Sequence, residues 1–277
     1  MVRRYLAPLV LAGLALGLGA CQAANASTDS WHPPIGEAGA QPAVSASTSH
    51  APSTAPVRAK TSPSPSAHSA SPDPSTTDNT GGPAGSINTT GTSAVALTFD
   101  DGPDASSMAV LDLLAQYHVK ATFCIIGRQV ADHPDVIRRI VADGHTLCNH
   151  TWDHDLNLAN GSTDHIRAEM QQTSDAIHAV VPDAKIAYFR APGGGFSTQV
   201  DQIASDMGMR SLDWNVDPQD WTKPGVQAII SNVMTHTDEG SIVLMHDGGG
   251  DRSQTVEALH TILPNFTGRF TLIPMPV

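Results

Sequence analysis

Two adjacent carboxylates, Asp100 and Asp101, stand at the end of an apolar run and directly before a Gly-Pro turn. The run, residues 94–99, is typical of a buried β-strand. Charged side chains at such a place are costly unless water, a partner or an ion meets them. Downstream, His150 and His154 lie four residues apart. One Asp and two His suffice to hold a hydrolytic metal ion with an open coordination position, which leaves the second Asp free to act as a base.

Strand-like and helix-like stretches alternate along the chain after residue 93. Strands are predicted at residues 94–99, 121–126, 145–149, 185–189, 210–214, 241–246 and 270–273. Helices are predicted at residues 108–117, 136–142, 164–180, 225–234 and 255–263. This alternation indicates an α/β fold, a distorted (β/α) barrel of about seven parallel strands with helices outside. The pattern alone leaves an open, doubly wound sheet as the alternative.

The residues that could do chemistry share one topological position. Asp100 and Asp101, His150, Arg190 and His246 each stand at or just past the C-terminal end of a predicted strand. In a parallel barrel these strand ends open onto one face, where active sites lie. We therefore expect residues that are distant in sequence to converge there.

The N-terminal segment, residues 1–20, has the pattern of a secretory signal. Arg3 and Arg4 precede a short apolar stretch, and small residues lead to Cys21. Cys21 resembles the lipidated cysteine of a bacterial lipoprotein, which predicts an exported, membrane-anchored protein whose catalytic domain faces the cell wall. An ordinary signal peptide followed by a chance cysteine is the alternative. Export by the general or by the twin-arginine route stays open.

Residues 21–93 are rich in Ser, Thr, Pro and Ala and predict a disordered linker. Residues 1–93 carry four basic and four acidic side chains, so the whole net charge of −12 falls on residues 94–277. An acidic domain argues against nucleic acid as a partner and leaves the lipid anchor as the expected contact with the membrane.

Five short motifs then appear in order within residues 94–277. They are Thr98-Phe99-Asp100-Asp101-Gly102, His150-Thr151-Trp152-Asp153-His154, Arg190-Ala191-Pro192-Gly193-Gly194, Asp217-Pro218-Gln219-Asp220-Trp221 and Ile242-Val243-Leu244-Met245-His246. Together they are similar to the motifs of the polysaccharide deacetylase family, the NodB-homology domain or carbohydrate esterase family 4. The resemblance covers nearly all of residues 94–277.

The resemblance implies a metal site with Asp101, His150 and His154 as ligands. Zinc would be the usual ion, and Co²⁺, Ni²⁺ or Mn²⁺ accept similar ligand sets. Asp100 resembles the family's general base, which takes a proton as water attacks an acetyl carbonyl. Arg190 resembles the residue whose cation relieves repulsion between the paired carboxylates. A surface ion pair is the alternative for Arg190.

On the other side of the site, His246 resembles the general acid that protonates the departing nitrogen. Asp220 would hold its imidazole in the cationic form. Trp221 and Leu244 resemble the walls of the acetyl pocket, with plain core packing as the alternative. Gly193 stands where many relatives carry Tyr. Its backbone N–H can still stabilise an oxyanion, so the difference concerns contacts with the substrate.

Cys124 and Cys148 lie on neighbouring predicted strands. An exported protein can form a disulfide there, and two separate buried thiols are the alternative. The sequence does not decide between them.

The sequence therefore predicts a metal-dependent hydrolase that removes acetyl groups from N-acetylated glycan, with peptidoglycan or a chitin-like oligosaccharide as the expected substrate. An O-acetyl xylan esterase of the same fold is the nearer alternative. A non-catalytic glycan-binding module is the more distant one.

Overall fold

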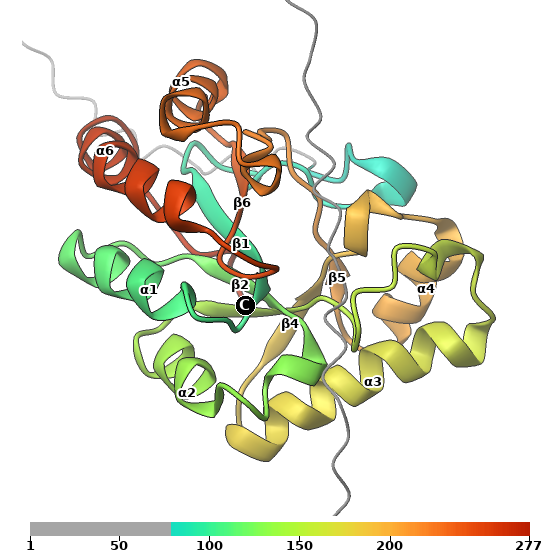
Figure 1. Ribbon diagram of the computed structural model, residues 1–277. Helices are drawn as coiled ribbons and strands as arrows, with labels where there is room; N and C mark the ends of the chain where they lie inside the picture. Colours follow the sequence, from blue (N-terminus) through green and yellow to red (C-terminus); the bar gives the residue numbers. More distant parts are fainter. Residues whose placement is uncertain (1–78) are drawn as a thin grey trace, which may run out of the picture. The chain divides into compact units, whose positions relative to one another are not determined.

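Six parallel strands form one curved sheet in the computed structural model, which describes residues 79–277 (Figure 1). The strands are β1 Ala96–Gly102, β2 Thr122–Ile125, β3 Thr146–Asn149, β4 Ile186–Phe189, β5 Arg210–Ser211 and β6 Ile242–His246. Their order across the sheet is β5-β4-β3-β2-β1-β6, and every neighbouring pair is parallel. The predicted α/β class with a parallel sheet is confirmed.

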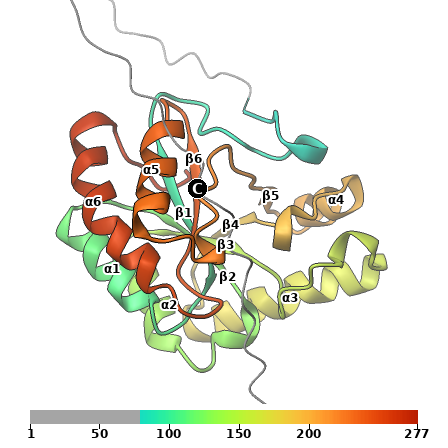
Figure 2. The same cartoon turned by 45° about the horizontal axis from the view of Figure 1, so that its top comes forward.

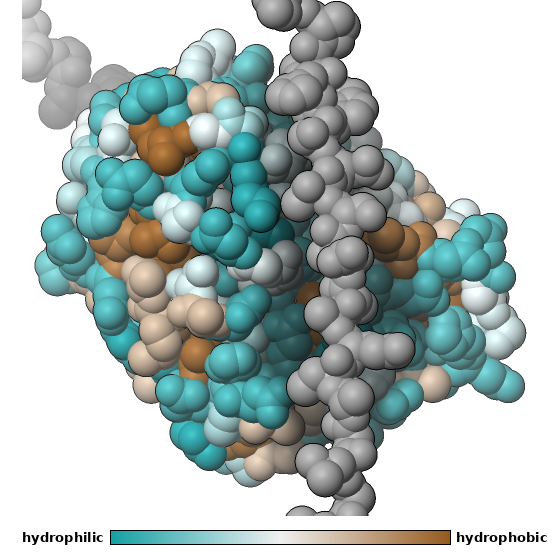
Figure 3. Space-filling view, viewed as in Figure 1, coloured by the Kyte–Doolittle hydropathy of each residue, from teal (hydrophilic) through white to brown (hydrophobic). Residues whose placement is uncertain are grey.

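Six α-helices cover the outside of the sheet (Figures 1 and 2). They are α1 Ser107–Gln116, α2 Pro134–Ala142, α3 Thr163–Val180, α4 Thr198–Asp206, α5 Val226–His236 and α6 Ser253–Arg269. Around the sheet they contact one another in the order α5, α6, α1, α2, α3 and α4, which follows the strand order. The face seen in Figure 3 is mostly hydrophilic, and its apolar residues form separate small patches.

Helix α4 is one element that the sequence analysis missed. Its N-cap is Ser197, whose hydroxyl oxygen accepts a hydrogen bond from the backbone N–H of Val200 (3.2 Å). Val200, Ile203 and Ala204 are buried and lie at helical spacing, which is the signal of an amphipathic helix.

Side-chain alternation along β1 decides which residues enter the barrel. Leu97 and Phe99 pack into the large core between the sheet and the helices. Ala96 belongs instead to the core inside the barrel, and the next residues on its face are Thr98 and Asp100. Asp100 is therefore placed in the barrel mouth by the two-residue period of the strand.

Asp101 would point away from the barrel if β1 continued regularly. The pairing of β1 with β2 shifts register between Asp100 and Gly102, so Asp101 is the extra residue of a bulge. Its φ of 71° lies in the left-handed region. A bulge re-aims the side chains around it, and here it lets two consecutive carboxylates face the same site.

Irregular segments close the gap between the edge strands β5 and β6. After β5, the backbone N–H groups of Asn215 and Val216 donate to Ile242 O (both 3.2 Å), and Leu244 N–H donates to Val216 O (2.9 Å). The predicted strand at residues 210–214 is therefore shorter than expected, because the chain leaves β4 to cross to β6. The result is a distorted barrel of six strands, compared with about seven in the prediction.

The predicted strand at residues 270–273 is wrong. Only one bridge forms there, between Val95 and Leu272. Ile273 is followed by Pro274-Met275-Pro276, and proline has no N–H with which to extend a ladder.

The predicted linker boundary at residue 93 is also wrong, because residues 79–93 belong to the ordered domain. Ile87 is 2% exposed, pairs with Leu212 and lies in the inner core. Its N–H donates to Ser211 O (2.9 Å), and its carbonyl accepts from Asp213 N–H (2.7 Å). Composition suggested a tether, but buried Ile87 and backbone hydrogen bonds, including one from Thr90 N–H to Gly240 O (2.9 Å), dock this segment.

Cys124 and Cys148 form a disulfide between directly paired positions of β2 and β3. Both side chains are buried inside the barrel. Cys148 lies two residues before His150, and Cys124 is paired with Asp100 in the β1–β2 register. Of the two alternatives that the sequence left open, the disulfide is confirmed.

The predicted signal segment 1–20, the lipidated Cys21 and the linker up to residue 78 lie outside the described residues. Within residues 79–277, none of the helices combines the length and the apolar character that crossing a bilayer requires.

We expect Ile87→Ala to lower the free energy of unfolding by about 2–5 kcal/mol, because it removes a fully buried side chain from the inner core. Urea unfolding of the full chain measures this. Val277→Ala is the control, since Val277 is 64% exposed. Equal unfolding midpoints for the two variants would show that residues 79–93 do not stabilise the domain.

Candidate active site

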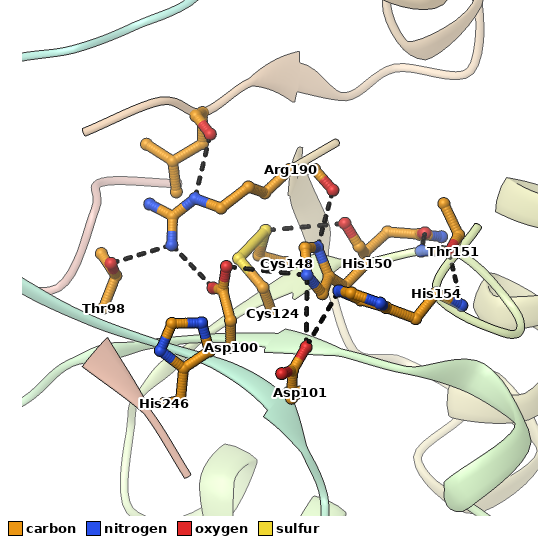
Figure 4. A network of polar contacts seen from close by, with 12 residues as sticks. Thr98, Asp100, Asp101, Cys124, Cys148, His150, Thr151, His154, Arg190 and His246 are labelled. Atoms are coloured by element: carbon orange, nitrogen blue, oxygen red, sulfur yellow. Dashed lines mark hydrogen bonds and ion pairs between the residues drawn. A yellow bond between two sulfur atoms is a disulfide. The ribbon is translucent and has the colours of Figure 1, made fainter. Parts of the chain in front are cut away.

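Asp101, His150 and His154 meet at the C-terminal end of the barrel (Figure 4). The Nε2 atoms of His150 and His154 lie 3.5 Å and 3.3 Å from the same oxygen, Asp101 Oδ1. The three candidate ligand atoms lie within 4.8 Å of one another. Asp101 Oδ1 is buried and accepts no hydrogen bond from residues 79–277. A buried oxygen left unpaired beside two imidazole nitrogens has the character of a ligand.

His150 is oriented by a second contact. Its Nδ1 lies 2.8 Å from the carbonyl oxygen of Arg190 and donates to it, which leaves Nε2 to face Asp101. Metal-binding histidines are commonly fixed in this way by a backbone carbonyl. Burial opposes the charged imidazole, but Asp100, Asp101 and the Arg190 carbonyl outweigh it and raise the pKa of His150.

The pKa of Asp101 responds to the same neighbours. Burial by itself would raise it, but the His150 imidazole that faces it, with smaller contributions from the charges of His246 and His154, lowers the pKa to about 2. The carboxylate is therefore ionised at neutral pH. Two imidazoles and one ionised carboxylate fit a divalent ion, and zinc is the ion for which this set is most typical.

Asp100 faces a different partner. Its Oδ1 accepts a hydrogen bond from Arg190 Nη1 (2.7 Å), and its Oδ2 lies 3.6 Å from His150 Nε2. Both Asp100 and Arg190 are buried. The alternative reading of Arg190 as a member of a surface ion pair is wrong.

Arg190 makes an unusually complete set of contacts for a buried cation. It donates to Thr98 Oγ1 (2.9 Å), Leu212 O (3.1 Å) and Asp213 O (3.2 Å) as well as to Asp100. The ring of Trp214 lies 5.5 Å from its guanidinium carbon. A buried ion pair is favourable only when its remaining donors are satisfied, and these contacts meet that condition.

His246 lies beside Asp100 in the register of β6 and β1. Its Nδ1 donates to Asp220 Oδ1 (2.7 Å), while Asp220 Oδ2 accepts from His246 N–H (2.9 Å) and from Thr255 Oγ1 (2.7 Å). Burial opposes the charged form, but the hydrogen bond and the charge of Asp220 outweigh it and raise the pKa of His246. His246 therefore keeps a proton to higher pH than an ordinary histidine.

Asp100, Asp101, His150, His154 and His246 line one cavity of about 480 Å³. Its walls include every predicted substrate-contacting residue, namely Gly193, Trp221 and Leu244. Trp221 is 53% exposed, so plain core packing is wrong for it, whereas Leu244 is buried beneath the cavity. Arg190 and Asp220 do not line the cavity. Arg190 is hydrogen-bonded to Asp100 and Asp220 to His246, and these two partners do line it.

The sequence analysis assigned no individual role to six further residues of the cavity wall. They are Leu156, Ala191, Trp214, Asp217, Gly249 and Arg252. Leu156 is 69% exposed and overhangs Gly193: a Cβ added there would lie 3.0 Å from Leu156 Cδ2. Gly193 also has a φ of 59°, which favours glycine. Ala191 and Asp217 stand within two of the five motifs, whereas the only signal for Trp214 and Leu156 was position: Trp214 follows β5 and Leu156 follows His154.

The geometry can now be compared with known proteins. The sequence model described as polysaccharide deacetylase matches residues 87–212. The chitooligosaccharide deacetylase of Sinorhizobium fredii is 38% identical over 195 residues, which cover 66% of this chain and 90% of that protein. This chain belongs to the polysaccharide deacetylase family. The resemblance inferred from the five motifs is confirmed.

Solved structures of this family have the same fold. A peptidoglycan N-acetylglucosamine deacetylase, Bc1960, aligns with a TM-score of 0.63 and 32% identity, over 66% of this chain and 86% of that one. A family 4 pseudoenzyme from Bacillus anthracis aligns with a TM-score of 0.58 and 30% identity, over 65% of this chain and 63% of that one. Fold similarity therefore does not by itself establish catalysis, and the side chains of the cavity must carry that argument.

We expect Asp220→Asn to lower the pKa of His246, because the substitution removes the charge that favours the imidazolium while keeping a hydrogen-bond acceptor. NMR titration of the His246 ring measures the shift. Glu257→Gln on α6 is the control, since it removes an exposed charge outside the cavity. An unchanged His246 pKa in Asp220→Asn would contradict the assigned cause of the shift.

Proposed function

We propose that this protein is a metal-dependent hydrolase that removes acetyl groups from N-acetylated glycan, with peptidoglycan or a chitin-like oligosaccharide as substrate. The observation that carries the proposal is the arrangement of one cavity: Asp100 and His246 lie side by side next to the Asp101–His150–His154 triad. A base and an acid beside a metal site are the groups that amide hydrolysis requires. The names of the relatives, chitooligosaccharide and peptidoglycan deacetylases, support the substrate class.

In this proposal Asp101, His150 and His154 hold a divalent ion, with zinc the preferred one. The bound ion supplies Lewis-acid activation of water and of the acetyl carbonyl. Asp100 accepts the proton that water loses as its oxygen attacks the carbonyl carbon. Arg190 pairs with Asp100 and fixes the orientation of its Oδ1 by a 2.7 Å hydrogen bond.

His246 completes the reaction on the leaving group. Its Nδ1 is held by Asp220, so Nε2–H faces the cavity and donates its proton to the nitrogen as the C–N bond breaks. The products are acetate and a free amino sugar. The raised pKa of His246 suits this role, because an acid must still carry its proton at the working pH.

The walls of the cavity would select the acetyl group. Leu244 is buried beneath the cavity and Trp221 stands at its exposed edge, so both can contact the acetyl methyl. The backbone N–H of Gly193 is the proposed donor to the developing oxyanion. The Gly193–Gly195 segment lacks side chains, so Leu156 offers the apolar contact on this side of the entrance.

Acetate release from chitooligosaccharide and from peptidoglycan fragments tests the proposal. The purified full chain should release acetate with zinc, lose activity with a chelator, and regain it when zinc is restored. Asp100→Asn should bind zinc normally but turn over about 10²–10⁴-fold more slowly, since general base catalysis contributes that much.

Acetylated xylan is the comparison substrate, because the same groups would hydrolyse an ester. If the protein released acetate only from acetylated xylan, the proposed amidase function would be wrong and the protein would be an esterase. Glycan binding that is unchanged by Asp100→Asn, with no acetate from any substrate, would indicate a binding module like a pseudoenzyme.

The proposal places the enzyme outside the cell, anchored by a lipid on Cys21. It rests on residues 1–21 of the sequence. We expect cells to incorporate radiolabelled palmitate into the wild-type protein and to release an unlabelled protein for Cys21→Ser. Wild-type protein that is secreted without label would leave an ordinary signal peptide as the explanation.

A further inference from the structure

The turn that carries the second histidine ligand bonds to side chains through its backbone N–H groups and to the backbone of residues 127 and 128 through two of its carbonyls. Four consecutive backbone N–H groups, those of residues 151–154, each donate to a side-chain oxygen. Asn149 accepts from Thr151 (3.0 Å), and Thr151 Oγ1 accepts from His154 (3.1 Å). The two N–H groups between them, those of Trp152 and Asp153, both donate to one carboxylate.

That carboxylate belongs to Glu169 on α3. Its Oε2 accepts from Trp152 N–H at 3.0 Å and from Asp153 N–H at 3.2 Å. Glu169 is only 6% exposed and takes part in none of the ion pairs found in residues 79–277. Burying a carboxylate with no cation costs free energy, which these two hydrogen bonds offset. Burial still raises the pKa of Glu169, and the two N–H groups oppose that rise.

The turn needs such support because its backbone is strained. Thr151 and His154 have φ values of 66° and 65°, although neither is glycine. Residues persist in this region only when their surroundings over-determine the conformation. The carbonyls of Thr151 and Trp152 are also bonded, each at 3.0 Å, to the N–H groups of Gly127 and Arg128. Among residues 79–277, Glu169 is the one charged side chain that accepts a hydrogen bond from this turn.

We propose that Glu169 is a positioning residue: its carboxylate holds the Thr151–His154 turn in the conformation that brings His154 to Asp101. The inference rests on the proposed metal site for its purpose, but the structural claim concerns the metal-free chain. His150 is held separately, through the Arg190 carbonyl. Within residues 79–277, the ring of His154 makes no hydrogen bond comparable to that of His150, so its direction depends on the turn, and therefore on Glu169.

Two substitutions separate this role from a general contribution to stability. Glu169→Gln keeps an oxygen that can accept both N–H groups, whereas Glu169→Leu keeps the volume and removes every acceptor. Ile177→Val is the matched control on α3, because Ile177 is buried in the main core and makes no contact that holds the turn. Glu257→Gln controls for the loss of one negative charge.

The first measurement is amide hydrogen exchange of the metal-free full chain. In Glu169→Leu, the amides of Trp152 and Asp153 should exchange about tenfold faster or more, while those in the middle of α3 keep their protection. Glu169→Gln should lie close to wild type. Ile177→Val should leave the turn unchanged. Unchanged protection of Trp152 and Asp153 in Glu169→Leu would overturn the proposal.

The second measurement is zinc affinity by isothermal titration calorimetry. Glu169→Leu should bind zinc about 10–100-fold more weakly, as is typical when a group that orients a ligand is lost. Glu169→Gln should lose less. Equal loss in both variants, or none in Glu169→Leu, would overturn the proposal. A wild-type chain that binds no zinc would refute the metal site alone, because amide exchange still tests Glu169.

If Glu169→Leu fails to fold, Glu169→Asp takes its place. Asp keeps the charge but withdraws the carboxylate by one methylene, so both amide protection and zinc affinity should fall. No change in either would overturn the proposal.

Discussion

The buried ion pair between Asp100 and Arg190 is the interaction on which the rest of the site depends. Two consecutive carboxylates at the mouth of a barrel repel each other, and burial opposes their ionisation. The Arg190 side chain supplies a fixed positive charge to one of them, at 2.7 Å. The backbone carbonyl of Arg190 orients His150, and the His150 ring faces the second carboxylate, Asp101. One residue at the end of β4 thus stabilises Asp100 directly and Asp101 through a histidine.

The desolvation of Arg190 explains much of the surrounding architecture. A buried guanidinium needs acceptors, and Thr98, Leu212 and Asp213 provide them from β1 and from the segment after β5. Removing one partner of such a pair costs about 3–5 kcal/mol, because the other charge is then left unpaired. The segment that closes the barrel is therefore tied to the charge balance of the site. Ile87, which pairs with this segment, links residues 79–93 to the same arrangement.

Strained backbone presents two of the three candidate metal ligands, Asp101 and His154. Asp101, Thr151 and His154 all have positive φ values, at a cost of about 1–2 kcal/mol each. In each case a regular strand or turn would direct the side chain elsewhere. The bulge at Asp101 and the side-chain contacts around Thr151 offset that cost. The proposed metal site is thus already arranged in the metal-free chain, and such preorganisation favours tight and selective binding.

The sequence alone determined the class of fold, the order of most elements and the strand ends at which the candidate site residues lie. Alternating periodicity placed Asp100, His150, Arg190 and His246 at strand ends, and parallel topology brings such ends together. It failed at residues 79–93, at residues 270–273 and at α4. There, the buried and hydrogen-bonded residues around Ile87, two prolines and one N-cap outweighed the average composition of each segment.

Tertiary structure alone decided how these groups face one another. The bulge that turns Asp101, the pairing that joins Cys124 to Cys148, and the cavity wall of Trp214 and Leu156 depend on contacts between distant segments. Such contacts leave no local periodicity in the sequence. The same holds for Glu169, which looks like an ordinary polar residue of an amphipathic helix. The residue types in the sequence show which functional groups are available, whereas long-range packing determines the distances between those groups in the site.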